Sequence, residues 1–157
     1  MKVQLLCIGK TSFRYLDEGI KLYQERLKHF TSFEMKVVPD IKNPKNMSVD
    51  EIKNKEGIAL LKQISQKEKL YLLDENGKSL SSEGFAQFLD QQLQIATKQI
   101  VFVIGGAFGF SDDVYRRADG KISLSKMTFS HQIIRLIFHE QLYRAYTIIN
   151  GIPYHNQ

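Results

Sequence analysis

The sequence predicts an α/β domain with a mostly parallel sheet flanked by helices. Apolar runs rich in strand-forming residues alternate along the chain with amphipathic helical patterns, the order that βαβ units produce. Two of the runs, LYLLD and IVFVIGG, are almost continuously hydrophobic, which is typical of strands buried on both faces of a parallel sheet. With 157 residues, of which 43% are hydrophobic, the chain is expected to form a single domain over residues 1–157.

Four strands and a weaker fifth are expected. The segments are Val3–Gly9, Phe33–Pro39, Leu70–Asp74 and Ile100–Gly106, with Lys121–Ser125 as the weaker candidate. The lone cysteine, Cys7, falls in the first of these runs. A buried thiol is its expected role, and a disulfide within one chain is impossible.

Helical patterns fill the gaps between these strands. The first two cover Phe13–Phe30 and a stretch from Ser48 to about Ile64. The third begins at Ser81, and Ala96 is the last residue of its apolar face. A short helix is expected after Ser111, and the last runs from about His131 to Asn150. Ser48 and Glu51 form a capping box, and Ser-Asp-Asp from Ser111 offers a cap with negative charge. The last helix is apolar on more than one face, so it is either a central core helix or packs a second side on another subunit. Ile41–Ser48 is predicted to be a flexible loop.

Several classes of protein find no support in the sequence. The apolar runs are too short to span a bilayer, and the first residues lack a signal-peptide pattern, so a cytoplasmic protein without membrane association is expected. The histidines lack the spacing of a zinc pair, and no cysteine cluster accompanies them, so no metal is expected. GKT (Gly9–Thr11) and GKS (Gly77–Ser79) lack the first glycine of a Walker loop and are predicted to be simple turns.

The net charge of +5 permits a polyanionic partner such as nucleic acid. Cations and aromatic residues alternate in the last third of the chain, a combination that suits phosphates and unstacked bases. A solvated helix face whose tyrosines belong to the core explains the same pattern equally well. These residues are Arg116, Arg117, Lys126, Arg135 and Arg144, with Tyr115, Phe129, Tyr143, Tyr146 and Tyr154.

Two irregular segments follow predicted strands. GGAFG (Gly105–Gly109) lies at the carboxyl end of a strand, where α/β sheets bind ligands, although its spacing differs from the dinucleotide fingerprint. A tight turn that needs positive φ fits it equally well. SLSKMTFSHQ (Ser123–Gln132) is rich in hydroxyl groups and has neither a strand nor a helix period.

Taken together, these segments resemble a known family. IGGAFG, SLSKMTFSHQIIR and EQLYRAYTIINGIPYH, with MKVQLLCIGK and KEGIALL, are similar to the SPOUT-class methyltransferases of the ribosomal RNA large subunit methyltransferase H family over essentially the whole chain. The resemblance implies one SPOUT domain with a C-terminal trefoil knot, a homodimer, and S-adenosyl-L-methionine as methyl donor. It implies N3 of a pseudouridine in 23S ribosomal RNA of the assembled ribosome as acceptor. The family commonly has proline where this chain has Ser130, which should loosen the backbone before the last helix.

Carried onto this sequence, the resemblance implies a cofactor site at or after the carboxyl ends of strands. Its residues are Leu73, Gly105, Leu124, Ser125, Lys126, Met127, Thr128 and Phe129. Main-chain groups would read the adenine edge, while Leu73, Leu124 and Met127 cover the faces of the base.

The acceptor nitrogen must lose a proton, and His131 or His155 is the expected base. Arg135 and Arg144 are expected to hold RNA phosphates or stabilise the ionised base, and Tyr143 and Tyr154 to stack on it. The C-terminal region of one chain is expected to serve the cofactor of the other. Two alternatives remain: a SPOUT methyltransferase of another RNA, and a non-enzymatic RNA-binding ribosome-assembly factor.

Overall fold

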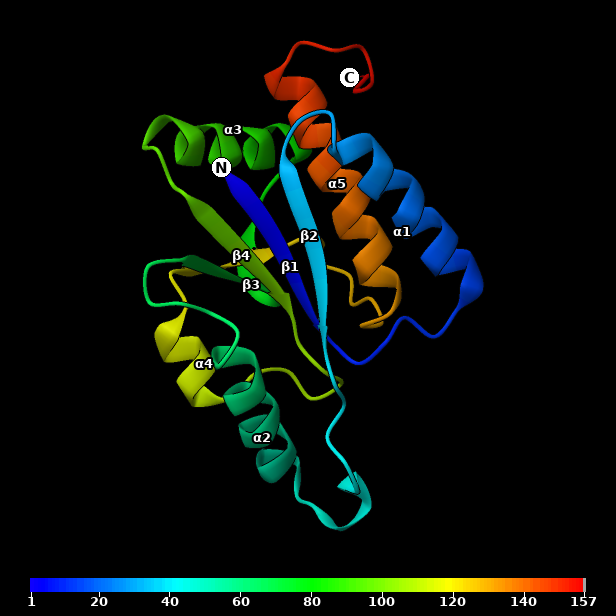
Figure 1. Ribbon diagram of the computed structural model, residues 1–157, viewed down its shortest axis with the longest axis vertical. Coiled ribbons are helices and arrows are strands. Elements are labelled where there is room, and N and C mark those ends of the chain that lie inside the picture. Colours follow the sequence, from blue (N-terminus) through cyan, green and yellow to red (C-terminus); the bar gives the residue numbers. More distant parts are fainter. Residues whose placement is uncertain (157) are drawn as a thin grey trace.

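The strands form one parallel sheet in the computed structural model, which describes residues 1–156 (Figure 1). The order is β2-β1-β4-β3-β5, and all four pairings are parallel. The bounds are β1 Lys2–Ile8, β2 Ser32–Val38, β3 Lys69–Ser79, β4 Gln99–Ile104 and β5 Gly120–Ser123. The predicted α/β class is therefore confirmed, including the weak fifth strand.

Helices cover both faces of the sheet (Figure 1). Their bounds are α1 Arg14–Leu27, α2 Val49–Leu61, α3 Ser82–Gln94, α4 Asp112–Arg117 and α5 Ile133–Ile149, with a 3₁₀ turn at Pro44–Asn46 inside the predicted loop. The first, third and fifth helices pack on one face, and α2 and α4 pack on the other. No helix in the described part of the chain is both long and apolar enough to cross a membrane.

Alternate residues of the central strands supply two separate cores. In β1, Leu5 and Cys7 belong to the core that contains Phe138 of α5, whereas Leu6 packs with Leu60 of α2 on the other face. This is the period-two alternation of a strand buried on both sides. Cys7 is a buried free thiol, as expected, and burial raises its pKa to about 12.

The helix starts show which sequence signals act as predicted. Ser48 Oγ accepts a hydrogen bond from the amide of Glu51 at 3.1 Å, and Ser81 caps α3 in the same way. Ser111 precedes α4, but its side chain makes no cap bond, and its hydroxyl is buried without a partner. Ala96 lies beyond α3 with φ of +55°, so its place on the helical stripe was wrong.

The GKS segment was predicted to be a turn, but it lies inside β3. Ile122 of β5 pairs with both Leu73 and Lys78, so Asp74–Gly77 bulges out of the strand. A Cβ on Gly77 would lie 2.7 Å from the backbone nitrogen of Ile122, closer than packed atoms approach. Glycine therefore permits the two backbones to meet, and the strand resumes after the bulge.

The start of α5 is tied to the segment that follows β1. Arg135 is fully buried, and its guanidinium donates to the carbonyls of Ile8, Gly9 and His131 at 2.7, 2.9 and 3.0 Å. Gln132 accepts from the amide of Ser12 at 2.8 Å and donates to a neighbouring carbonyl. The expectation that Arg135 contacts RNA was wrong, because its donors are occupied by protein acceptors and none of its surface is exposed. The trefoil knot stays a prediction.

Candidate functional site

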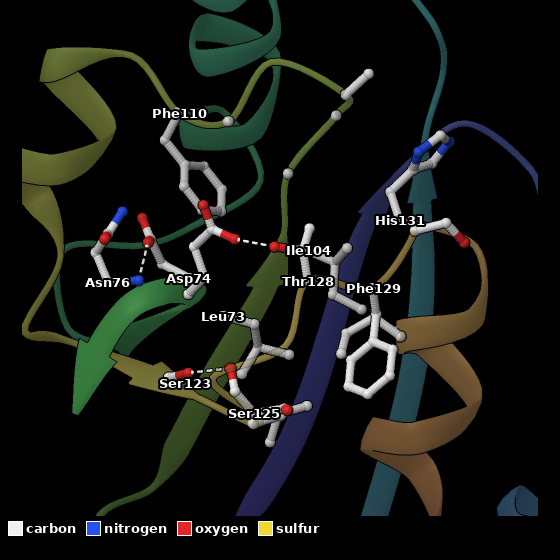
Figure 2. A pocket seen from close by; sticks show the side chains of 18 of the residues that line it. Leu73, Asp74, Asn76, Ile104, Phe110, Ser123, Ser125, Thr128, Phe129 and His131 are labelled. Carbon is white, nitrogen blue, oxygen red and sulfur yellow. Dashed lines mark hydrogen bonds between the residues drawn. The ribbon is translucent and has the colours of Figure 1, made fainter. Parts of the chain in front are cut away.

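A pocket of about 540 Å³ opens at the carboxyl ends of β3, β4 and β5 (Figure 2). Its volume lies within the range of small-molecule sites, roughly 300–1,000 Å³. Three irregular segments build most of its wall: the β3 bulge, the Gly-rich turn after β4, and the hydroxyl-rich segment after β5. The pocket therefore sits where parallel α/β sheets ordinarily bind ligands.

The Gly-rich turn after β4 is both a tight turn and a pocket wall. The amide of Gly109 donates to the carbonyl of Gly106 at 3.2 Å, and Gly109 has φ of +82°. A Cβ on Gly106 would lie 2.6 Å from both carboxyl oxygens of Glu56 in α2. Burial, with a smaller effect from Asp40, raises the pKa of Glu56, and its Oε2 atom is buried without a hydrogen-bond partner. The glycine thus lets the turn rest directly on a buried carboxyl group.

The hydroxyl groups after β5 hold an irregular backbone in place. Ser123 Oγ donates to the carbonyl of Ser125 at 2.8 Å, and Ser125 Oγ accepts from the amide of Met127 at 2.9 Å. Ser130 Oγ accepts from the amide of Ile133 at 3.3 Å, so the residue that replaces the family's proline provides a bond at the entry to α5. Such local bonds satisfy main-chain groups that no helix or strand ladder uses.

The β3 bulge contributes carboxylates that the sequence did not single out. Tyr115 OH donates to Asp74 Oδ2 at 2.5 Å, and Asp74 Oδ1 accepts from the amide of Asn76 at 2.8 Å. Glu75 Oε2 accepts from the Thr128 hydroxyl at 2.7 Å, which joins two walls of the pocket. Burial and the nearby Asp74 carboxylate raise the pKa of Tyr115, which therefore stays a donor. The available signal was a run of polar residues directly after a buried strand, at the sheet's carboxyl edge.

Seven of the eight residues predicted to hold the cofactor line this pocket. They are Leu73, Gly105, Leu124, Ser125, Met127, Thr128 and Phe129. Lys126 is exposed and does not line it. Met127 is 75% exposed at the rim. The pocket brings together segments far apart in sequence, and their part in binding stays a prediction.

The two histidines predicted as bases lie at opposite ends of α5. His131 lines the pocket where this helix begins (Figure 2), whereas His155 follows the end of the helix. The helix has 17 residues, which corresponds to about 25 Å at the usual rise per residue. One chain therefore cannot bring both imidazoles to the same reaction centre in this arrangement. A third histidine, His139, is buried in the core, and burial lowers its pKa to about 4.

The far end of α5 holds a network of charged side chains. His155 Nε2 lies 2.6 Å from Glu83 Oε1, and its Nδ1 lies 3.2 Å from an Arg144 nitrogen. Arg144 also donates to Glu140 at 3.0 Å. Because guanidinium can only donate and carboxylate can only accept, Nδ1 lies where it can accept from Arg144 and Nε2 lies where it can donate to Glu83. The hydrogen bond from His155 is among the effects that lower the pKa of Glu83 to about 2, after the backbone bond of Glu83 itself.

Tyr143 and Tyr154 belong to the same end of the molecule. Their rings meet edge to face with centroids 4.8 Å apart, and the Arg144 guanidinium lies 4.8 Å from the Tyr154 centroid. Tyr154 OH also lies 3.3 Å from Tyr23 OH. Both rings are half-buried and outside the pocket. The structure therefore groups Arg144, Tyr143, Tyr154 and His155 together, and separates them from the pocket of their own chain.

No group of three or more side chains suited to hold a metal ion occurs within residues 1–156. The pocket lining contains neither lysine nor arginine. This lining offers main-chain groups, hydroxyls, apolar surface and two carboxylates. It therefore suits a nucleoside-like ligand better than a phosphate.

Comparison with known proteins gives consistent results. Residues 1–155 match the family described as "Predicted SPOUT methyltransferase". Proteins named ribosomal RNA large subunit methyltransferase H match over 157 residues and the full length of both chains, with 52% identity in Parabacteroides distasonis, 49% in Christiangramia forsetii and 48% in Flavobacterium johnsoniae. Among solved structures, Archaeoglobus fulgidus Nep1 bound to S-adenosylhomocysteine is similar over 85% of this chain and 70% of the Nep1 chain. The TM-score is 0.44 and the sequence identity is 13%, a likeness too low to support a conclusion.

Proposed function

This chain belongs to the SPOUT methyltransferase family, and from that premise we propose that it methylates N3 of a pseudouridine in 23S ribosomal RNA with S-adenosyl-L-methionine as donor. The names of relatives that are 48–52% identical over their full length support ribosomal RNA as the substrate. The observation that carries the proposal is the pocket at the carboxyl edge of the sheet, where the residues expected to hold the donor meet.

The residues of this pocket fit the proposed donor. Gly105 and Gly106 place main chain at the pocket wall, and Leu73 and Leu124 supply apolar surface for a base. The hydroxyl groups of the segment after β5 supply polar partners, and the absence of lysine and arginine from the lining suits a ligand without phosphate. Leu73, Gly105 and the residues from Leu124 to Phe129 that line the pocket would hold it.

In the reaction, the donor supplies an activated methyl group with a good leaving group. The protein is left with two tasks, which are positioning the acceptor and removing the N3 proton. His131 lies at the pocket edge, exposed to an incoming nucleotide, and imidazole is the side chain best suited to take a proton near neutral pH. His131 is therefore the base that one chain can offer at its own pocket.

The residues at the far end of α5 require a second subunit to take part. We place Arg144, Tyr154 and His155 of one chain beside the pocket of the other in a homodimer. Arg144 would hold the ionised base or a phosphate, and the tyrosines would stack on the acceptor. The separation of the two ends along a 17-residue helix supports this arrangement. An enzyme acting on assembled ribosomes would work in the cytoplasm.

The decisive experiment is mass spectrometry of 23S ribosomal RNA after incubation of under-methylated ribosomes with the protein and labelled donor. One added methyl group at a pseudouridine N3 is expected. A methyl group on another RNA or nucleotide would assign a different SPOUT activity. Binding of RNA with steep salt dependence, but no affinity for the donor in calorimetry, would indicate a non-enzymatic assembly factor.

The base is tested by single-turnover methylation with His131→Ala and His155→Ala. A slower chemical step with unchanged donor affinity is expected for the variant that lacks the base. If both variants kept the wild-type rate at saturating ribosome, neither imidazole would be the base.

Mixed dimers test whether the site is shared. One subunit carries Gly105→Val at the pocket, and the other carries Arg144→Ala at the tail. If the site is shared, the intact pocket of one subunit meets the intact tail of the other, so the mixed dimer should have about half of the wild-type activity. Complete inactivity of the mixed dimer would mean that each chain uses its own tail.

A further inference from the structure

The pocket carries a charge opposite to that of the protein as a whole. The chain has a net charge of +5, yet the pocket lining contains Asp74 and Glu75 and neither lysine nor arginine. Two lysines lie near this wall but outside the lining: Lys126 is exposed, and Lys121 Nζ lies 5.3 Å from the centroid of the Tyr115 ring. His131 is the remaining ionisable base in the lining. The pocket is therefore locally acidic at neutral pH.

Hydrogen bonds hold both carboxylates at the pocket wall. Asp74 uses one oxygen for Tyr115 OH and the other for the amide of Asn76. Glu75 accepts the Thr128 hydroxyl through Oε2. The two side chains thus connect the β3 bulge to α4 on one side and to the segment after β5 on the other. A surface carboxylate without such bonds would turn toward solvent, whereas these remain directed to the same cavity.

We propose that Asp74 and Glu75 make the pocket discriminate between methyl donor and demethylated product by charge. The inference rests on the proposed function. S-adenosyl-L-methionine bears a sulfonium, an ammonium and a carboxylate, which leaves one net positive charge. When the methyl group bonds to N3, the sulfur keeps the electron pair of the broken bond and the N3 proton leaves to a base. The product, S-adenosylhomocysteine, therefore has no net charge, and the acidic wall attracts it less.

The size of the effect follows from Coulomb attraction in a site open to solvent. Opposite unit charges about 6 Å apart, at an effective dielectric constant between that of the protein surface and that of water, change an affinity by roughly three- to tenfold. High salt should reduce the difference, because the pocket is in contact with solvent. Charge discrimination of this kind lets the product be replaced by fresh donor.

Calorimetry with Glu75→Gln tests the proposal. Glutamine keeps an acceptor for the Thr128 hydroxyl while removing the charge. We expect the ratio of the product Kd to the donor Kd to fall roughly three- to tenfold, through weaker donor binding and an unchanged product Kd. Sinefungin, in which an amine-bearing carbon replaces the methylated sulfur, also carries a positive charge there and should lose affinity as the donor does. Glu25→Gln removes the same charge from the outer surface of α1 and should leave the ratio unchanged.

Asp74→Asn provides a second variant. Asparagine has a single side-chain oxygen, so it can keep only one of the two hydrogen bonds that the Asp74 carboxylate accepts from Tyr115 and Asn76. If both variants bind both ligands and neither changes the ratio by as much as twofold, the charge proposal is wrong while the proposed function stands. If the wild-type protein binds neither ligand, the proposed function itself fails. The two failures are therefore distinguishable in one set of titrations.

Discussion

The two ends of α5 are built by opposite means. At its first end, glycines, hydroxyls and irregular main chain surround an open pocket. At its C-terminal end, charged and aromatic side chains contact one another around Arg144, and most of their hydrogen-bonding groups already have a partner within the chain. An open main-chain wall can adapt its hydrogen bonds to a ligand, whereas a completed side-chain network presents a fixed shape to a partner. The first end is suited to bind a small molecule, and the second to meet a macromolecule or another subunit.

The largest effect on stability is expected at the pocket end from Arg135→Met. The change removes the Arg135 donors from the carbonyls of Ile8, Gly9 and His131, and a carbonyl that is buried without a donor is costly. We expect the free energy of unfolding to fall by roughly 3 kcal/mol or more, measured by urea denaturation. Arg14→Met is the control, since Arg14 is an exposed partner of Glu18 and should change little. Equal stability of the two variants would refute the structural role given to Arg135.

Gly77→Ala should come next, because it breaks the β3 bulge. The added Cβ meets the backbone of β5 at 2.7 Å, so the strands must separate. A loss of roughly 1–3 kcal/mol is expected, together with at least tenfold weaker donor binding. Gly84→Ala in α3 is the matched control, because its Cβ has ordinary contacts no closer than 3.5 Å. A Gly77 variant with unchanged affinity would show that the bulge does not shape the pocket.

Arg144→Met separates stability from activity at the far end. Methionine keeps apolar contact with Tyr154 but loses the partly exposed ion pair with Glu140, so the expected stability loss is below about 1 kcal/mol. Methylation of ribosomes should nevertheless fall at least tenfold, with donor affinity unchanged. Lys28→Met, which loses an exposed pair with Glu25, is the control for both assays. Wild-type activity of the Arg144 variant would remove the tail from the proposed mechanism.

The smallest effect is expected from Glu56→Gln, and it should depend on pH. Burial raises the pKa of Glu56, so the folded protein keeps this proton to higher pH than the unfolded chain does. Stability is therefore lost as pH rises above about 4.3, the ordinary value for glutamate. The glutamine variant lacks this loss, so its denaturation midpoint should improve relative to wild type between pH 4 and pH 7. A constant difference across this range would mean that Glu56 titrates normally.

Much of the fold could be predicted because local patterns and tertiary packing agree. The apolar runs gave β1, β2 and β4 to within one or two residues at each end, and Ser48 and Ser81 marked helix starts correctly. The extension of β3 could not be predicted, because polar residues after Leu73 become strand only through their pairing with β5. Arg135 was misplaced for a related reason. A cation among aromatics fits either a surface or a core until the acceptors around it are known.

The segments that line the candidate site were predictable, whereas several of the side-chain contacts within it were not. The family resemblance implied a site at Leu73 and Gly105, and parallel sheets bind ligands at the carboxyl ends of their strands, where both residues line the observed pocket. Asp74, Glu75 and Tyr115 carry no motif, and their roles depend on a bulge and on contacts between separate elements. The separation of His131 and His155 followed from the predicted helix between them, but the sequence does not show which part of the molecule lies at each end of that helix.

The bonds between α5 and the segment after β1 also set a condition on synthesis. Gln132 and Arg135 reach back 120 or more positions to Lys10, Ser12, Gly9 and Ile8, and the pocket wall immediately precedes them in the chain. A nascent chain can pair β1 with β2 early, but it cannot fix that wall before translation has passed Arg135. An enzyme that marks finished ribosomes would thus complete its own donor pocket only when nearly all of it has left a ribosome.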